Sequence, residues 1–184
     1  INQNDPASVE AGAYYVKARG VPAENVIRVH LPHGAAKLAR EQFETLRATL
    51  DAQAPAAVQA LLLVWTTPYA VECNAITAAL TLGLDEALCS RTCAPSRPSP
   101  YYDSASLRPR DDLSLRISML LPADDIAMAR ALIDRGVAAD RRMPRGTAYL
   151  VKTADANRNT RAAFYPRDAA LRKPPLRIRN LESE

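Results

Sequence analysis

The stretch VQALLLVWTT, residues 58–67, decides the fold class of this 184-residue chain. Residues 60–65 within it are apolar at every position. A strand with one exposed face alternates apolar and polar side chains, whereas a strand covered on both faces is apolar throughout. We therefore predict that this segment is an interior strand of a parallel sheet.

Helical and strand patterns alternate on both sides of this segment. A helix is predicted to begin at Pro6, because Asp5 can cap it, and to end before Gly20, which can adopt a left-handed conformation. This alternation predicts an α/β fold: a three-layer, mostly parallel sheet with helices on both faces. The other predicted elements are helices near 35–53, 73–82, after 124 and near 155, and strands near 26–30, 115–121 and 147–153.

The length fits a single α/β domain over residues 1–184. A long irregular insertion is predicted at about 85–114, where prolines are frequent and periodicity is absent. Such insertions often cover a ligand site. The tail at about 166–184 is rich in proline and arginine, and we expect little regular structure there. No run approaches the roughly 18 apolar residues of a membrane span, so none is predicted.

The net charge of +4 comes from the second half of the chain. Residues 93–184 carry 17 Lys and Arg against 11 Asp and Glu, whereas residues 1–92 carry 7 against 9. This basic half could bind nucleic acid, but it lacks the aromatic and glycine interleaving of a recognisable nucleic-acid module. A solvated basic face explains it more simply, so nucleic acid is an alternative that we do not favour.

Ligands of an open parallel sheet gather beyond the carboxyl ends of its strands. The loops that follow the predicted strands offer polar side chains for this purpose. No glycine-rich phosphate loop or GxSxG nucleophile motif is present, and we predict no cofactor. The predicted ligand-binding residues are Thr67, Tyr69, Glu72, Asn74, Asp155 and Arg158.

The three cysteines allow several kinds of site. A disulfide, Cys89–Cys93 or Cys73–Cys89, is favoured about equally with reduced thiols. Alternatively, His30 or His33 could serve Cys73 as a catalytic base, and we name His30 and Cys73 as the catalytic candidates. The spacing of the histidines and cysteines is loose for a zinc module, so no metal site is predicted.

Several stretches resemble a family of bacterial proteins of uncharacterised function. They are NDPASVEAGAYYVKARGVPAENV at 4–26, VECNAITAALTLGLDEALCSRTC at 71–93, RPSPYY at 97–102, ARALIDRGVAAD at 129–140 and PRGTAYLVKTADANRNTRA at 144–162. The resemblance implies export to the periplasm or the cell exterior. Family members continue beyond both ends of this sequence, with a strand-like segment ahead of it. The resemblance thus implies a sheet that is incomplete here, its remainder being missing, removed by processing or supplied by a second polypeptide segment.

The sequence therefore predicts an exported α/β domain that binds a ligand or partner at the carboxyl edge of its sheet. One alternative is a peptidase-like hydrolase that uses His30 and Cys73. The order of strands and loops is distantly similar to that of caspase- and gingipain-type peptidases, which is a likeness of architecture alone. The second alternative is nucleic-acid binding through the basic half.

Overall fold

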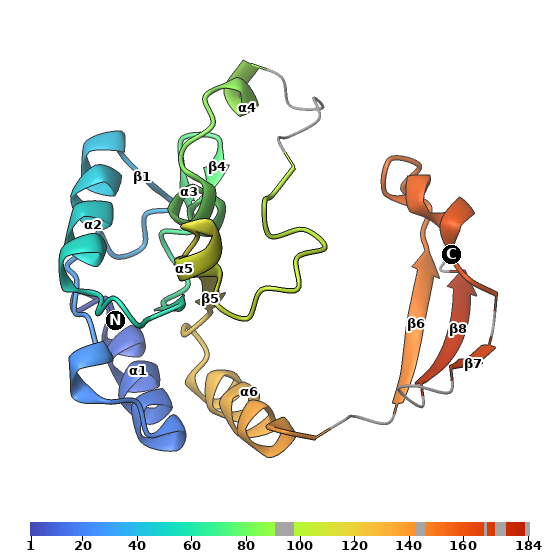
Figure 1. Cartoon of the computed structure of the whole chain (residues 1–184), viewed down its shortest axis with the longest axis horizontal. Helices are drawn as coiled ribbons and strands as arrows, with labels where there is room; N and C mark the ends of the chain where they lie inside the picture. The colour runs from blue at the N-terminus through green and yellow to red at the C-terminus, as the bar shows by residue number, and fades with distance from the viewer. Residues whose placement is uncertain (91–97, 143–145, 168, 172–175, 183–184) are drawn as a thin grey trace. The chain divides into compact units, whose positions relative to one another are not determined.

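The computed structural model describes residues 1–90, 98–142, 146–167, 169–171 and 176–182. It shows a mixed α/β chain that divides into two compact units, Ile1–Val137 and Ala138–Glu184 (Figure 1). The number of domains stays a prediction. No helix in the described parts of the chain is long and apolar enough to cross a membrane.

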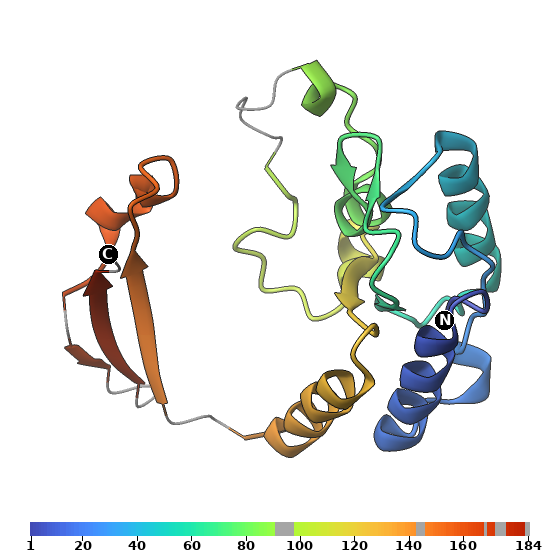
Figure 2. The same cartoon turned by 180° about the vertical axis from the view of Figure 1, so that it is seen from behind.

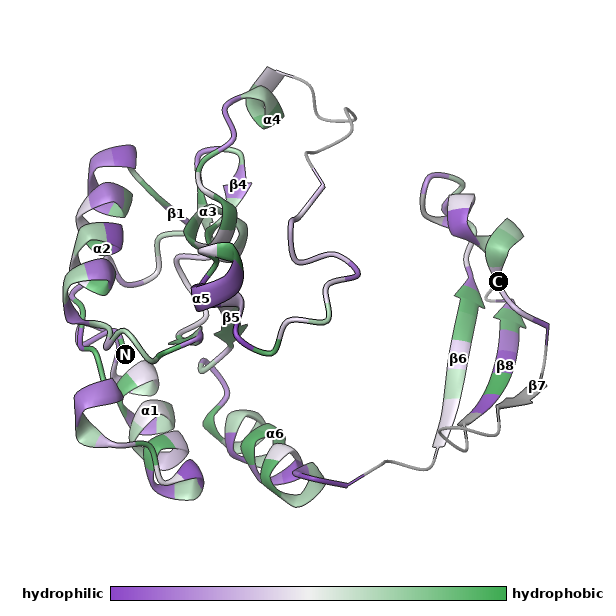
Figure 3. Cartoon of the chain, in the orientation of Figure 1, coloured by the Kyte–Doolittle hydropathy of each residue, from purple (hydrophilic) through white to green (hydrophobic). Residues whose placement is uncertain are grey.

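The first unit is built around a parallel strand pair. Strands β2 (Ala60–Val64) and β5 (Ile117–Leu121) pair over their full length, from Ala60 opposite Ile117 to Val64 opposite Leu121. Both strands lie within the segments that the sequence predicted as strands, and their parallel pairing is confirmed. The hydropathy colouring shows β5 as a hydrophobic arrow (Figure 3).

Successive residues of β2 pack into different hydrophobic clusters. Leu61 and Leu63 pack with α2 (Arg40–Gln53) and α3 (Ile76–Leu82). Leu62 and Val64 pack instead with residues of α1 (Pro6–Arg19) and α6 (Ile126–Ala139). Because neighbouring side chains of a strand point in opposite directions, this division explains why β2 is apolar at every position.

Helix α1 has the predicted boundaries. The carboxylate of Asp5 accepts a hydrogen bond of 3.0 Å from the N–H of Ala7, and Gly20 adopts the left-handed conformation with φ 60°. Its neighbour is α6, because the Tyr14 hydroxyl donates to Asp134 at 2.7 Å. Figures 1 and 2 show the two helices side by side from opposite directions.

The predicted strand near 26–30 is much reduced. The described chain has there only a short 3₁₀ turn (Ala23–Asn25) and an isolated parallel bridge between Val29 and Asn2. A strand needs a partner along its length, and residues 1–3 supply one only to Ile27 and Val29.

The helix predicted over 73–82 begins later, at Ile76. Strands β3 (Ala70–Val71) and β4 (Asn74–Ala75) precede it as a tight antiparallel hairpin, and β1 (Lys37–Leu38) pairs in parallel with β3. The predicted insertion contains two short helices in its described residues, α4 (Ala87–Ser90) and α5 (Pro109–Leu113).

The second unit contains a three-stranded sheet. Strand β6 (Gly146–Lys152) pairs in parallel with β8 (Leu176–Glu182), and β7 (Ala169–Leu171) pairs antiparallel with β8. The helix expected near 155 is a 3₁₀ helix, Arg158–Phe164. Our expectation of little regular structure after residue 166 is corrected by β7 and β8. The sequence LRIR at 176–179 has the period-two alternation of a strand, which the prolines before it obscured.

Candidate functional site

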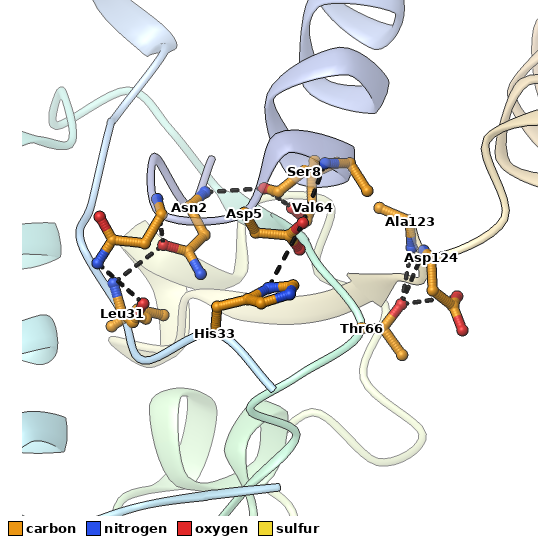
Figure 4. Close-up of polar contacts among 11 residues, drawn as sticks. Asn2, Asp5, Ser8, Leu31, His33, Val64, Thr66, Ala123 and Asp124 are labelled. Carbon is orange, nitrogen blue, oxygen red and sulfur yellow. Dashed lines mark hydrogen bonds and ion pairs between the residues drawn. The ribbon is translucent and has the colours of Figure 1, made fainter. Parts of the chain in front are cut away.

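The side chain of Thr66, just after β2, forms hydrogen bonds with the residues that follow β5, at the carboxyl ends of both strands. The hydroxyl of Thr66 donates to the Asp124 carboxylate at 2.8 Å and accepts from the backbone N–H groups of Ala123 and Asp124, at 2.9 and 3.1 Å (Figure 4). This edge is where an α/β sheet ordinarily binds its ligands. We call the polar group around it the carboxyl-edge cluster, and its members are Asn2, Asp5, Ser8, His33, Thr66 and Asp124.

A buried carboxylate lies beside an exposed imidazole in this cluster. Asp5 is only 6% exposed, whereas the side chain of His33 is 63% exposed. The Nδ1 atom of His33 is 3.8 Å from the Asp5 carboxylate, which is within ion-pair range when the imidazole is protonated. This distance is too long for a hydrogen bond, but the exposed ring can offer a nitrogen to an external group beside the buried carboxylate.

Asn2 connects the start of the chain to β2 and to the loop that carries His30 and His33. Its side-chain oxygen accepts from the N–H of Leu31 at 2.9 Å and from that of Asn4 at 3.2 Å. Its own N–H donates to the hydroxyl of Ser8 at 2.8 Å, and that hydroxyl donates to the carbonyl of Val64. These bonds hold the first turn of α1 at the end of β2.

The side-chain nitrogen of Asn2 is buried and has no hydrogen-bond partner among the described residues. In Figure 4 it points toward His33. A buried donor without a partner costs roughly 1–3 kcal/mol, so this nitrogen calls for an explanation, of which a partner supplied by a bound molecule is one.

His30, the predicted catalytic base, lies on the same loop. Its Nδ1 atom is 3.1 Å from the side-chain oxygen of Asn4, and the Asn4 amide donates to the carbonyl of Leu31 at 3.1 Å. Both histidines of the sequence HLPH therefore contact residues that precede α1. Of the two, only His33 lies beside a carboxylate within ion-pair distance in the described chain.

Cys73 is bonded to Cys89, with their Cα atoms 5.1 Å apart. This is one of the two pairings that the sequence left open, and Cys93 lies outside the described residues. A half-cystine has no thiol, so a His30–Cys73 nucleophile pair is not formed in this structure. The catalytic role of these residues stays a prediction.

Glu72 is held by an arginine. Its two carboxylate oxygens accept from Nε and Nη2 of Arg40, each at 2.9 Å, and Arg40 also contacts Glu86 at 2.8 Å. The hydrogen bonds from Arg40 lower the pKa of Glu72, and the same bonds raise the pKa of Arg40. Glu72 stands at a backbone φ of 50°, in the turn between β3 and β4.

The side chain of Asn74, in β4, bonds to the backbone of Asp85. It is 2% exposed, donates to the carbonyl of Asp85 at 3.2 Å and accepts from the N–H of Asp85 at 3.1 Å. We call this region the disulfide corner, and its members are Arg40, Glu72, Cys73, Asn74, Asp85, Glu86 and Cys89. The predicted ligand residues Glu72 and Asn74 thus hold protein groups here, and their role toward a ligand stays a prediction.

The other predicted ligand residues are dispersed. Thr67 precedes a cis peptide bond to Pro68, and Tyr69 is 51% exposed. Asp155 and Arg158 belong to the second unit, where the Asp155 carboxylate accepts from the N–H of Asn157 at 3.0 Å.

Sequence reasoning missed most of the carboxyl-edge cluster. Asp5 was interpreted only as a helix cap, and Asn2 and Ser8 were not considered. The edge rule was applied only to loops after predicted strands, and no strand was predicted ahead of α1. The available signal was that α1 is followed by a strand pattern, so its N-terminus must also face an edge of the sheet.

No group of three or more His, Cys, Asp or Glu in the described ranges is arranged to hold a metal ion. Comparisons of the chain with protein-family models, with curated proteins and with solved structures gave no match.

Proposed function

We propose that this chain binds a small polar ligand at the carboxyl edge of the β2–β5 sheet, with His33 as the residue that contacts it. The observation that carries this proposal is the exposed imidazole of His33 beside the buried carboxylate of Asp5. An exposed histidine with nothing to orient it is an ordinary surface residue. Here the carboxylate of Asp5 is held by the N–H of Ala7 and lies within ion-pair range of the ring.

The ligand requires both donor and acceptor groups. His33 offers one ring nitrogen to it, and the Asp124 carboxylate, already bonded to Thr66, offers an acceptor at the same edge. The two carboxylates of this cluster, Asp5 and Asp124, repel anions. We therefore expect a neutral or cationic ligand, such as an amide, an amine or a polyol, in preference to a phosphate.

The fold proposed for this function is the three-layer arrangement predicted from the sequence. It is supported by the two hydrophobic clusters that meet at successive residues of β2, one containing α2 and α3 and the other α1 and α6. We also propose that the protein is exported. The Cys73–Cys89 disulfide supports this, because disulfides persist in oxidising compartments.

Nuclear magnetic resonance of the histidine side chains tests the binding proposal. With only 2 histidines in the chain, the imidazole signals of His33 and His30 can be assigned with His33→Gln and His30→Gln. A panel of acetamide, methylamine, glycerol and inorganic phosphate is then titrated. Saturable shifts of His33 with a neutral or cationic probe, lost in Asp5→Ala, are expected. Shifts that are absent for every probe, in a protein that remains folded, contradict the proposal.

The same Asp5–His33 pair favours one second function, hydrolysis by acid–base catalysis at this edge. It differs from the His30–Cys73 alternative in needing no thiol. Turnover of a peptide library that is lost in His33→Gln and kept in Cys73→Ser would support it. Turnover that is lost in Cys73→Ser and kept in His33→Gln would support the His30–Cys73 alternative instead.

A further inference from the structure

A polar pocket of about 410 Å³ lies in the first unit at the amino ends of β2 and β5. The two strands are parallel, so this edge of the sheet is the one away from the carboxyl-edge cluster. Its lining includes Leu61 of β2, Leu115 just ahead of β5, and residues from the last turns of α2 and α3. Because three guanidinium groups share this lining, we call it the arginine pocket; its arginines are Arg47, Arg110 and Arg116.

Arg116 brings a nearly buried charge to the arginine pocket. Its side chain is 9% exposed, its Nε donates to the carbonyl of Val58 at 3.3 Å, and its Nη1 lies 3.5 Å from the Asp51 carboxylate. Both distances are longer than a typical N–H···O hydrogen bond, whereas Arg40 in the disulfide corner donates twice to Glu72 at 2.9 Å. A guanidinium carries several N–H donors, and most of those on Arg116 have no acceptor among the described residues. A buried charge requires partners, and an external acceptor can supply them here.

The pocket has more positive than negative charge. Asp51 is the one carboxylate among the described residues that line it, and two arginines share this group: Nε of Arg47 is 4.0 Å away and Nη1 of Arg116 is 3.5 Å away. The guanidinium of Arg110 has no hydrogen-bond or ion-pair partner in the described ranges, since only its backbone N–H is bonded. The lining thus carries three positive charges and one negative, which is a net charge of +2.

Other negative groups nearby do not cancel this charge. The Asp111 carboxylate is 2.6 Å from Arg108, and the Asp112 carboxylate accepts from the Ser106 hydroxyl at 2.6 Å. Neither aspartate lines the pocket. The carboxyl ends of α2 and α3 add partial negative charge, at most about half an elementary charge each, and the pocket stays positive.

We infer that the arginine pocket binds the phosphoryl group of a small organic phosphate. A phosphoryl group carries a charge of about −1.5 to −2 and three acceptor oxygens, and guanidinium groups match such oxygens with paired N–H donors. The Thr81 hydroxyl also lines the pocket; it accepts from the N–H of Ser118 at 3.0 Å and keeps its own proton to donate. The volume of about 410 Å³ is that of a small-molecule site, and leucines line the part that would contact the organic body.

Calorimetric titration with phenyl phosphate tests this inference. Arg110→Gln and Arg47→Gln remove pocket charges from exposed positions, and Arg135→Gln, on the exposed surface of α6, is the matched control that removes the same charge elsewhere. We expect each pocket variant to raise the Kd for phenyl phosphate about tenfold, because each loses a charge-assisted hydrogen bond to the phosphoryl oxygens. The control should bind as the unchanged protein does. Arg116 is left in place, because its burial makes loss of the fold a competing explanation.

Asp51→Asn gives a test of opposite sign. It removes the carboxylate of the pocket, so it should lower the Kd for phenyl phosphate by about threefold or more. An unchanged or raised Kd in this variant, with the fold intact by circular dichroism, would overturn the inference. Equal weakening by Arg135→Gln and the pocket variants would do the same, because it would indicate attraction to basic surface in general. So would the absence of binding to the folded, unchanged protein.

Inorganic phosphate distinguishes the source of the phosphoryl group. We expect it to bind more weakly than phenyl phosphate, and equal or tighter binding would overturn the assignment to an organic phosphate. The imidazole signals of His33 are followed in the same titrations and should not move. Shifts of His33 that persist in Arg110→Gln would place the anion at the carboxyl edge and overturn the inference. The proposed function has its own probes at His33, so each site can fail without the other.

Discussion

The carboxyl-edge cluster and the disulfide corner are both rich in polar residues, but they use them differently. In the disulfide corner, Arg40, Glu72 and Asn74 bond to other protein groups and join the β3–β4 hairpin to residues 85–89. In the carboxyl-edge cluster, a buried carboxylate supports an imidazole that is mostly exposed. Residue type and loop position therefore do not distinguish polar residues that hold the fold from polar residues that face a ligand. The partner of each polar group does.

The largest effect is expected from removing the disulfide. It closes a loop of 16 residues, and the chain-entropy model gives such a bridge about 3 kcal/mol of stability. Cys73→Ser, Cys89→Ser and the double variant should therefore unfold at clearly lower denaturant concentration and lose about the same stability as one another.

The control for this experiment is Cys93→Ser. It should leave the midpoint of unfolding unchanged, because Cys73 and Cys89 pair with each other. A loss with Cys93→Ser and Cys89→Ser but not with Cys73→Ser would assign the bridge to Cys89 and Cys93 instead.

Asn74→Ala should have the next largest effect. It leaves the N–H and carbonyl of Asp85 without the partners that Asn74 provides in a buried position, at a cost of about 2 kcal/mol. Chemical denaturation measures this loss, and the His33 signals should not move. A change in ligand binding with no change in stability would make Asn74 a ligand residue after all.

Two substitutions of Asp5 distinguish its effect on the stability of the fold from its effect on ligand binding. Asp5→Ala removes the cap of α1 and should cost about 1 kcal/mol, whereas Asp5→Asn keeps a capping oxygen and should cost a few tenths. Both variants remove the charge beside His33, so both should weaken binding of the probes. Retained binding in Asp5→Asn would show that the carboxylate charge is not required.

The smallest effect is a pH dependence at Glu72. The hydrogen bonds from Arg40 lower the pKa of Glu72 in the folded protein below its ordinary value of 4.5. This group therefore contributes stability above pH 4.5, and the contribution is lost as the pH falls through the folded pKa. Acid unfolding of Arg40→Gln should show a weaker dependence on pH in this range. An unchanged acid profile would mean that the pair is not formed in solution.

The sequence was sufficient for the elements whose signals are local. The cap and stop residues around α1, the continuous apolar run of β2 and the nearly continuous one of β5 predicted these elements correctly. Predictions failed where the outcome depends on residues distant in sequence. Residues 26–30 have the composition of a strand but pair with residues 1–3 only through Ile27 and Val29, around an isolated bridge. Strand β8 follows two prolines, and its alternation was overlooked.

Prediction of the site is limited in the same way, by contacts between residues that are distant in sequence. Glu72 and Asn74 were selected because they follow a strand, yet their partners Arg40 and Asp85 are 32 and 11 residues away along the chain. Asp5 is 28 residues from His33, and no spacing rule connects them. Which of these residues face a ligand depends on pairings that only the folded chain reveals.

The most direct test of the central claim measures both regions in one experiment. The imidazole signals of His33 and the side-chain amide signals of Asn74 are followed while acetamide, methylamine and glycerol are titrated into the protein. We predict saturable shifts at His33 with at least one probe and none at Asn74. Shifts at Asn74 with His33 unchanged would contradict ligand binding at the carboxyl-edge cluster and would place the ligand at the disulfide corner.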